Sequence, residues 1–393
     1  MGIYFYSICL SVVLIYLVNK VLSRKNSIIY WALSVVALLP TTIVAGVRDL
    51  TIGTDIQHYV TNNFLAAQGY NNLFKYLNYI NNIKTAYVGS VNHTEPGYSV
   101  IVFLVSRFTS DVHWLLFTLQ MLTVLFVYIG LVNFHKQFDG SITMGMIVYD
   151  FLFFGPSLNI MRQSLAAAVV FMGVSLLLEN RIKLAVMCFF IASLFHLTAL
   201  ISLVFVVFYF YFRSKENQPQ SREFLFGRFI TIIIIFVGVY LVCPYLFKGI
   251  QIIVSFIPFL SKYGPSFDVQ TGYKLFGTFM FVVTDFIMIG LSSFNVGSRE
   301  KGLLSRFFFA SICLTVFFYA IYKYQSVIPR LGIYFAILRI AAYPYYLSIE
   351  KYFSMKLLIS ILLIISLALS FVYTTQSGSG EIYPYTSQAL QIY

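Results

Sequence analysis

Charged side chains are scarce in this sequence. Lys, Arg, Asp and Glu together make up 10% of its 393 residues, whereas a soluble domain carries about 25%. Hydrophobic residues supply 59%, so a water-soluble fold would lack the polar side chains needed to cover its surface. In lipid this difficulty disappears. The composition therefore predicts an integral membrane protein that crosses the bilayer many times.

Cysteine is also rare. The four cysteines are Cys9, Cys188, Cys243 and Cys313. Each lies inside an apolar segment and no two have Cys-x-x-Cys spacing, which argues against a disulfide framework and against a thiolate metal site. The N-terminus has neither a positively charged first region nor a small-residue cleavage site, so we expect a retained anchor and not a signal peptide.

Acidic residues are fewer than basic ones, 14 against 26, and the formal net charge is +12. The basic residues gather in short loops, which is typical of the cytoplasmic loops of membrane proteins and does not indicate a nucleic-acid partner. The four clusters are Lys20, Arg24 and Lys25; Arg213, Lys215, Arg222 and Arg228; Arg299, Lys301 and Arg306; and Lys351 and Lys356. Placing these clusters in the cytoplasm puts both termini on the extracytoplasmic side.

The apolar runs set the expected architecture. A spanning helix needs about 20 apolar residues, and these runs lack the alternation of barrel strands. We therefore expect an all-α polytopic membrane helix bundle of about twelve transmembrane helices, in a single membrane domain over 1–393. The expected spans are 3–18, 28–46, 97–109, 112–133, 141–156, 160–178, 183–212, 228–247, 273–294, 303–322, 331–349 and 355–373.

Segment 183–212 leaves two arrangements open, because it is long for one crossing. It forms either one tilted helix or two short arms that meet at the outer surface around His196. In the second arrangement 97–133 crosses once, and 97–109 is a re-entrant or interfacial helix. That arrangement places Arg162 and His196 at the outer face.

Two polar stretches are extracytoplasmic in this topology. They are the long loop 47–95, after the second helix, and a second loop, 248–272. A connection of about 50 residues is long, and such loops are commonly functional. The many aromatic residues of 47–95 favour a loop folded against the membrane over a solvated linker.

Ionisable side chains inside apolar segments cost roughly 2.5–3.5 kcal/mol each on insertion, so they usually have a role. Here they are Asp150, Arg162, His196, Asp285 and Arg339. Each also has a structural alternative: an interhelical pair, a snorkelling side chain or, for His196, a hydrogen-bonded packing residue.

A series of short motifs runs along the chain. They are Arg48-x4-Gly53-x-Asp55-x3-Tyr59, Glu95-Pro96-Gly97-Tyr98, Arg162-Gln163-x2-Ala166, Phe195-His196, Arg330-x3-Tyr334-Phe335 and Pro384-Tyr385. In this order they resemble the EpsG family of polysaccharide polymerases, which are relatives of the Wzy polymerases of O-antigen and capsule assembly. The resemblance covers nearly the whole chain.

The resemblance implies a glycosyltransferase of the bacterial cytoplasmic (inner) membrane, with its active site on the extracytoplasmic face. An undecaprenyl-diphosphate-linked glycan would donate its chain to a new lipid-linked repeat unit, whose sugar hydroxyl attacks the donor's anomeric carbon. Undecaprenyl diphosphate would leave, and the product would be O-antigen, capsule or exopolysaccharide. The implied partners are the two lipid-linked glycans, the bilayer and, where one exists, a chain-length regulator.

The chemistry implied for the site is the stabilisation of a departing diphosphate. Guanidinium groups bind phosphate in a bidentate way and stay charged. Histidine is suited to act as a general base near neutral pH, so His196 is the preferred base, with Asp55 and Glu95 as alternatives. The expected catalytic residues are Arg48, Arg162, His196 and Asp55. The expected substrate-binding residues are Tyr59, Glu95, Tyr98, Gln163, Arg330 and Tyr334.

No metal site is evident, because the five histidines are scattered, and we expect no cofactor. Four other functions remain open. They are a flippase or transporter for lipid-linked oligosaccharide, another multi-spanning lipid-linked glycosyltransferase, an O-antigen ligase and a sugar O-acyltransferase. Transporters often contain internal repeats, and none is found here.

Overall fold

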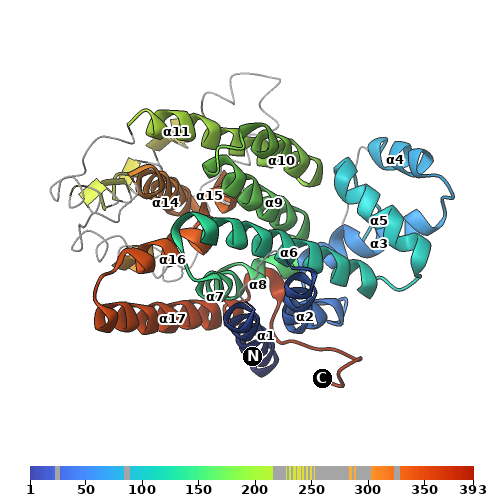
Figure 1. Cartoon of the computed structure of the whole chain (residues 1–393). Coiled ribbons are helices and arrows are strands. Elements are labelled where there is room, and N and C mark those ends of the chain that lie inside the picture. The colour runs from blue at the N-terminus through green and yellow to red at the C-terminus, as the bar shows by residue number, and fades with distance from the viewer. Residues whose placement is uncertain are drawn as a thin grey trace. The chain divides into compact units, whose positions relative to one another are not determined.

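The described residues are almost entirely helical (Figure 1). The structure is a computed structural model, and it describes residues 1–22, 27–83, 89–215, 302–322 and 328–393, with scattered positions between 227 and 288. Within these ranges no β-strand is present beyond one isolated bridge between Ser387 and Ile392. The all-α prediction is therefore confirmed.

The helices follow one another in a simple order. They are α1 (Gly2–Val21), α2 (Ile28–Gly46), the π-helix η1 (Ile56–Val60), α3 (Thr61–Gln68), α4 (Leu73–Asn81), α5 (Pro96–Phe108), α6 (His113–Phe138), α7 (Ile142–Leu152), α8 (Phe154–Asn159), α9 (Met161–Leu178), α10 (Ile182–Phe195), the 3-10 helix η2 (Leu197–Leu203), α11 (Val204–Arg213), α14 (Gly302–Tyr322), η4 (Ile328–Gly332), α15 (Ile333–Ala336), α16 (Arg339–Ile349), α17 (Phe353–Gln376) and η5 (Ser379–Glu381).

The chain divides into two compact units. Unit 1 comprises Met1–Leu203 and Leu367–Tyr393, and unit 2 comprises Val204–Ser366. The motifs from Arg48 to His196 and the Pro384-Tyr385 motif all belong to unit 1. The motif that begins at Arg330 belongs to unit 2.

Six of the described helices are long and apolar enough to cross a membrane, which supports the prediction of a membrane protein. They are α1, α2, α6, α9, Gly302–Tyr319 of α14, and α17. The expected span 228–247 is described only in part, and the expected span 273–294 and the expected loop 248–272 lie mostly outside the described residues. The figure of twelve spans therefore stays a prediction.

Segment 183–212 is not one helix. Helix α10 ends at Phe195, and His196 has an extended backbone with φ −156° and ψ 117°. A 3-10 helix, η2, follows directly. The structure thus has a break at His196, while the expected position of this break at the outer membrane surface stays a prediction.

Helix α5 is too short to span a bilayer. Its 13 residues extend about 20 Å at 1.5 Å per residue, against a hydrocarbon core of about 30 Å. At its start Gly97 lies against Leu194 of α10. After α5, Phe117 in the second turn of α6 lies against Gly46 at the end of α2. The number of times that 97–133 crosses the bilayer stays a prediction.

Helix α9 is the central helix of unit 1. It packs against α6, α8 and α10, and nearly all of its side chains are buried. Close approach depends on small residues, since a Cβ at Gly173 would lie 2.8 Å from the Phe189 ring and one at Gly130 of α6 would lie 2.6 Å from the Phe171 ring. Small residues at helix contacts are a common means of packing in membranes.

Polar side chains join α1, α2 and α6 inside unit 1. The hydroxyls of Tyr30 and Tyr128 lie 2.7 Å apart, and those of Ser34 and Tyr128 lie 3.0 Å apart. Tyr30 also donates to Asn19 Oδ1 at 3.0 Å. Such interhelical hydrogen bonds contribute about 0.6 kcal/mol each on average, and they fix the relative rotation of the three helices.

In unit 2 the side chains of Asp285 and Arg339, which were expected inside the membrane, pair with each other. Arg339 donates from Nε to Asp285 Oδ1 at 2.9 Å and from Nη2 to Asp285 Oδ2, and Tyr343 donates to the same carboxylate at 2.7 Å. Both charged side chains are fully buried. For Asp285 and Arg339 the structure agrees with one of the structural alternatives, an interhelical pair.

The topology around α5 can be tested by cysteine labelling in a variant without the native cysteines. His93 and Asp111 flank α5, and Asp139 follows α6; we expect His93→Cys and Asp111→Cys to react with an impermeant reagent from the same side of the membrane. Asp139→Cys should react from the other side, because α6 crosses between them. Labelling of positions 93 and 111 from opposite sides would contradict this arrangement.

Candidate active site

Arg162 lies in the first turn of α9, the central helix of unit 1. Its side chain is 21% exposed, so it is held by protein on most sides but remains open on one. The backbone breaks just before it, because Ile160 has φ −88° and ψ 59°. This break separates α8 from α9 and directs the start of α9 toward the loop before α5.

Two polar partners orient the Arg162 guanidinium. Nη1 donates to Glu95 Oε2 at 2.5 Å, and Nε donates to the Tyr59 hydroxyl at 3.0 Å. The guanidinium also lies 4.5 Å from the centroid of the Tyr59 ring and 5.8 Å from that of the Tyr98 ring. In the part of the chain that the structure describes, Nη2 has no hydrogen-bond partner.

Tyr59 extends this chain of hydrogen bonds to Asp55. Its hydroxyl donates to Asp55 Oδ2 at 2.5 Å. Burial raises the pKa of Tyr59 well above its usual value, so the hydroxyl stays protonated and serves as a donor. Both residues belong to one turn, since Asp55 precedes the π-helix η1 and Tyr59 lies within it. Single π-turns often occur at functional sites.

Glu95 connects Arg162 to the break at His196. Glu95 Oε1 accepts from the backbone N–H of Leu197 at 3.4 Å, and a Cβ at Gly97 would lie 2.7 Å from the carbonyl of Leu194. The start of α5 is therefore pressed against the end of α10. His196 is half-buried there, with Nδ1 at 2.6 Å from the Thr198 hydroxyl.

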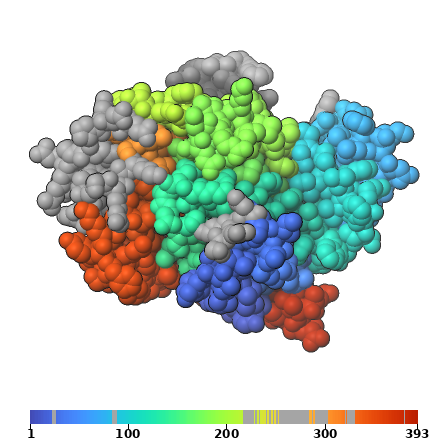
Figure 2. Space-filling model, viewed as in Figure 1, coloured from blue at the N-terminus to red at the C-terminus, as the bar shows by residue number. Residues whose placement is uncertain are grey.

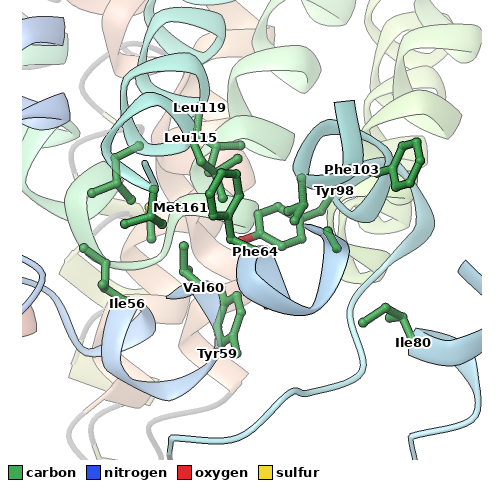
Figure 3. Packing of buried hydrophobic residues seen from close by; sticks show 14 of the residues in the cluster. Ile56, Tyr59, Val60, Phe64, Ile80, Tyr98, Phe103, Leu115, Leu119 and Met161 are labelled. Carbon is green, nitrogen blue, oxygen red and sulfur yellow. The ribbon is translucent and has the colours of Figure 1, made fainter. Parts of the chain in front are cut away.

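A buried apolar cluster packs around the tyrosines that contact Arg162. Tyr59 and Tyr98 lie among apolar side chains from η1, α3, α5, α6 and α9 (Figure 3). Tyr98 is fully buried, and its hydroxyl has no hydrogen-bond partner within the described ranges. The cluster fixes the rings on which Arg162 lies, so its guanidinium has a defined position.

Arg48 differs from Arg162 in exposure and in partners. It is 1% exposed, and it donates to the carbonyls of Ala45, Leu158 (2.8 Å) and Ile52 (3.3 Å). Burial lowers its pKa to about 10, which leaves it charged at neutral pH. This geometry does not favour a direct contact between Arg48 and a phosphate. It indicates that Arg48 holds the loop after α2 against α8.

Three further residues, Gln163, Arg330 and Tyr334, were expected to bind substrate. Gln163 is buried beside Arg162 on α9. In unit 2, Arg330 is exposed on η4 and Tyr334 is fully buried in α15. The roles of these three residues in substrate binding stay predictions. Across the described residues no group of three or more His, Cys, Asp or Glu side chains could hold a metal ion.

Asn159 belongs to the site, although the sequence analysis predicted no role for it. Its Oδ1 accepts from the Thr54 hydroxyl at 2.5 Å and from the backbone N–H of Asp55 at 3.3 Å. The only indication of a role in the sequence is that Asn159 lies three residues before Arg162. A contact across more than 100 residues of sequence cannot be predicted from that position alone.

Comparison with known protein families finds a match over most of the chain. The model of the EpsG family matches residues 31–387, a range that includes every residue of the hydrogen-bond chain from Asp55 to Arg162 and Leu197. Neither a curated protein nor a solved structure matches the chain.

The different environments of the two arginines predict different effects on stability. Arg48→Met leaves three buried carbonyls without their donor, at about 1–3 kcal/mol for each, so the melting midpoint in detergent should fall by several degrees. Arg181→Met is the matched control, because Arg181 is 55% exposed in its pairing with Glu179; its midpoint should stay unchanged. Equal midpoints for both variants would contradict the buried role of Arg48.

Proposed function

The chain belongs to the EpsG family, a family of Wzy-type polysaccharide polymerase-like proteins. We propose that it polymerises lipid-linked oligosaccharide repeat units into a surface polysaccharide. Family membership and the apolar helices make it a membrane protein of polysaccharide biosynthesis. In the proposed reaction an undecaprenyl-diphosphate-linked glycan is transferred to a new lipid-linked repeat unit. The site would face the extracytoplasmic side of the bacterial cytoplasmic membrane, with both termini on that side.

The observation that carries the proposal is the partly satisfied guanidinium of Arg162. Glu95 and Tyr59 fix its orientation through Nη1 and Nε, and the side chain stays partly open. The N–H groups of Nη2 are left to bind an anion, with a planar geometry that suits phosphate. A preorganised donor of this kind can contribute several kcal/mol when negative charge develops on a leaving group.

The bond changes follow from this placement. The oxygen of the acceptor hydroxyl forms a bond to the anomeric carbon, the bond from that carbon to the diphosphate breaks, and the diphosphate retains the electron pair. Arg162 stabilises the negative charge that develops there. The hydroxyl proton passes to a base. Because diphosphate is already a good leaving group, the reaction needs no strong general acid.

His196 is our preferred base, because histidine is suited to accept a proton near neutral pH, whereas the two carboxylates are engaged in orienting Arg162. Asp55 accepts from Tyr59, and Glu95 accepts from Arg162 and from the backbone of Leu197. Both carboxylates therefore orient Arg162. His196 lies at the end of α10, one residue before the N–H that Glu95 binds. Tyr59 and Tyr98 support the guanidinium, and Gln163, Arg330 and Tyr334 stay predicted substrate contacts.

The principal alternatives are a lipid-linked oligosaccharide flippase and an O-antigen ligase. Gel analysis of the surface glycan separates them. In a strain from which the gene has been deleted, a polymerase defect leaves a core that bears one repeat, a flippase defect leaves no repeat, and a ligase defect leaves polymer on the lipid carrier. A chain-length regulator, where one acts, would change only the distribution of lengths.

Arg162→Ala should reproduce the polymerase defect while the protein remains in the membrane. We expect polymer formation to fall by about 10²-fold or more, the scale for loss of one preorganised donor. Arg162→Lys should recover part of it, since a lysine keeps the charge but lacks the fork. The readout is the long-chain ladder together with the amount of protein in the membrane.

Arg181→Ala is the matched control, because this arginine follows the opposite end of α9 and should leave the ladder unchanged. A full ladder from Arg162→Ala would overturn the proposed role of Arg162. Loss of activity on treatment with EDTA would instead favour a metal-dependent lipid-linked glycosyltransferase.

A further inference from the structure

The C-terminal residues 380–388, which we term the tail segment, lie along the loop that leads to Asp55. The backbone N–H of Asp49 donates to Thr386 O at 3.0 Å, and that of Gly53 donates to Glu381 O at 3.1 Å. The Ser387 hydroxyl donates to Val47 O at 2.5 Å. The tail segment thus supplies hydrogen-bond partners to three points of this loop from more than 300 residues away.

Two tyrosines anchor the tail segment to the helices of unit 1. Tyr4 of α1 donates to Ile382 O at 2.7 Å, and Tyr385 donates to Val44 O near the end of α2 at 2.9 Å. The Tyr4 and Tyr385 rings pack edge to face, with centroids 5.3 Å apart. In Figure 2 the red C-terminal residues lie beside the blue N-terminal helices. The tail segment is therefore a fixed part of unit 1 and not a loose end.

Asn159 joins the tail segment to the first acid of the site. Its Oδ1 holds the Thr54 hydroxyl and the backbone N–H of Asp55. On its other side Gly380 approaches so closely that a Cβ there would lie 2.9 Å from Asn159 Nδ2, and Gly380 has φ +73°. The Asn159 side chain is therefore held between the tail segment and Asp55.

Asp55, which Asn159 holds, is linked through Tyr59 to Arg162. Asp55 accepts from Tyr59, and Tyr59 accepts from Arg162. The loop is also tightly packed against α8, since a Cβ at Gly53, with φ +97°, would lie 2.7 Å from Leu158 O. A shift of the backbone at Asp55 would therefore move the Tyr59 hydroxyl and rotate the guanidinium.

We propose that Asn159 and the tail segment are positioning elements of the active site, which hold Asp55 and Tyr59 so that Arg162 meets the phosphates in a defined orientation. The proposal rests on the proposed function of Arg162. Neither element touches the substrate. Their effect is on the turnover rate, because misplacement of a catalytic group by about 1 Å can cost about 10²-fold.

Variants of Asn159 test the proposal in membrane vesicles. The substrate is the cell's own lipid-linked repeat unit, extracted from the deletion strain that accumulates it. Asn159→Ala removes the acceptor oxygen, and we expect kcat to fall about 10–10²-fold with KM and the melting midpoint nearly unchanged. Asn159→Asp keeps an acceptor oxygen for Thr54 and Asp55 and should restore most of kcat.

Three further variants complete the test. Thr54→Val is isosteric, removes one of the two hydrogen bonds to Asn159, and should lower kcat several-fold even where Asn159→Ala fails to fold. Ser387→Ala should act in the same direction through the tail segment. Tyr393→Ala is the control, because this terminal side chain is 92% exposed, and its kcat should equal that of the wild type.

The outcomes separate this inference from the proposed function. Wild-type kcat for Asn159→Ala and Thr54→Val, beside an inactive Arg162→Ala, would overturn the positioning role alone. A loss of kcat that only follows a lower melting midpoint would also overturn it. An active Arg162→Ala would overturn the proposed function itself, whatever Asn159 does.

Discussion

The ion pair between Arg162 and Glu95 connects the parts of unit 1 that carry the motifs. Through Arg162 it holds the start of the central helix α9, and through Glu95 it holds the start of α5 and the backbone after α10. An arginine at the end of an apolar helix is costly without partners. Here one carboxylate, one hydroxyl and two aromatic rings stabilise it, yet they leave part of the fork open. The stability of this contact and the proposed binding of an anion therefore depend on the same side chain.

Three arginines of the chain show how environment decides what a guanidinium can do. Arg339 in unit 2 is neutralised by the bidentate Asp285 and is fully buried. Arg48 is equally buried, but its donors are used by main-chain carbonyls. Arg162 is oriented by two partners and remains 21% exposed. Of these three, Arg162 combines a fixed orientation with free donors, which is the combination that binding of a diphosphate requires.

Much of the site could be predicted from sequence, because its residues stand in motifs at the ends of apolar segments. Arg162, Glu95, Tyr59 and Asp55 were expected together, and unit 1 brings them into one hydrogen-bond chain.

The role expected for Arg48 was less predictable, since the sequence does not reveal that a charge beside a loop will be covered. The contacts of Asn159 and the tail segment depend on tertiary packing between residues that are 104 to 378 positions apart in the sequence, so no local pattern could indicate them. Among the expected helices, 97–109 and 183–212 were difficult because composition alone cannot distinguish a crossing from a short apolar helix that turns back.

The central claim is that the open side of Arg162 binds the diphosphate of a polyprenol carrier, and a binding measurement on purified protein tests it most directly. The account predicts that undecaprenyl diphosphate binds the wild type at least tenfold more tightly than it binds Arg162→Ala. Undecaprenol, which has no phosphate, should bind the two proteins equally. The same affinity of undecaprenyl diphosphate for the wild type and for Arg162→Ala would contradict the account.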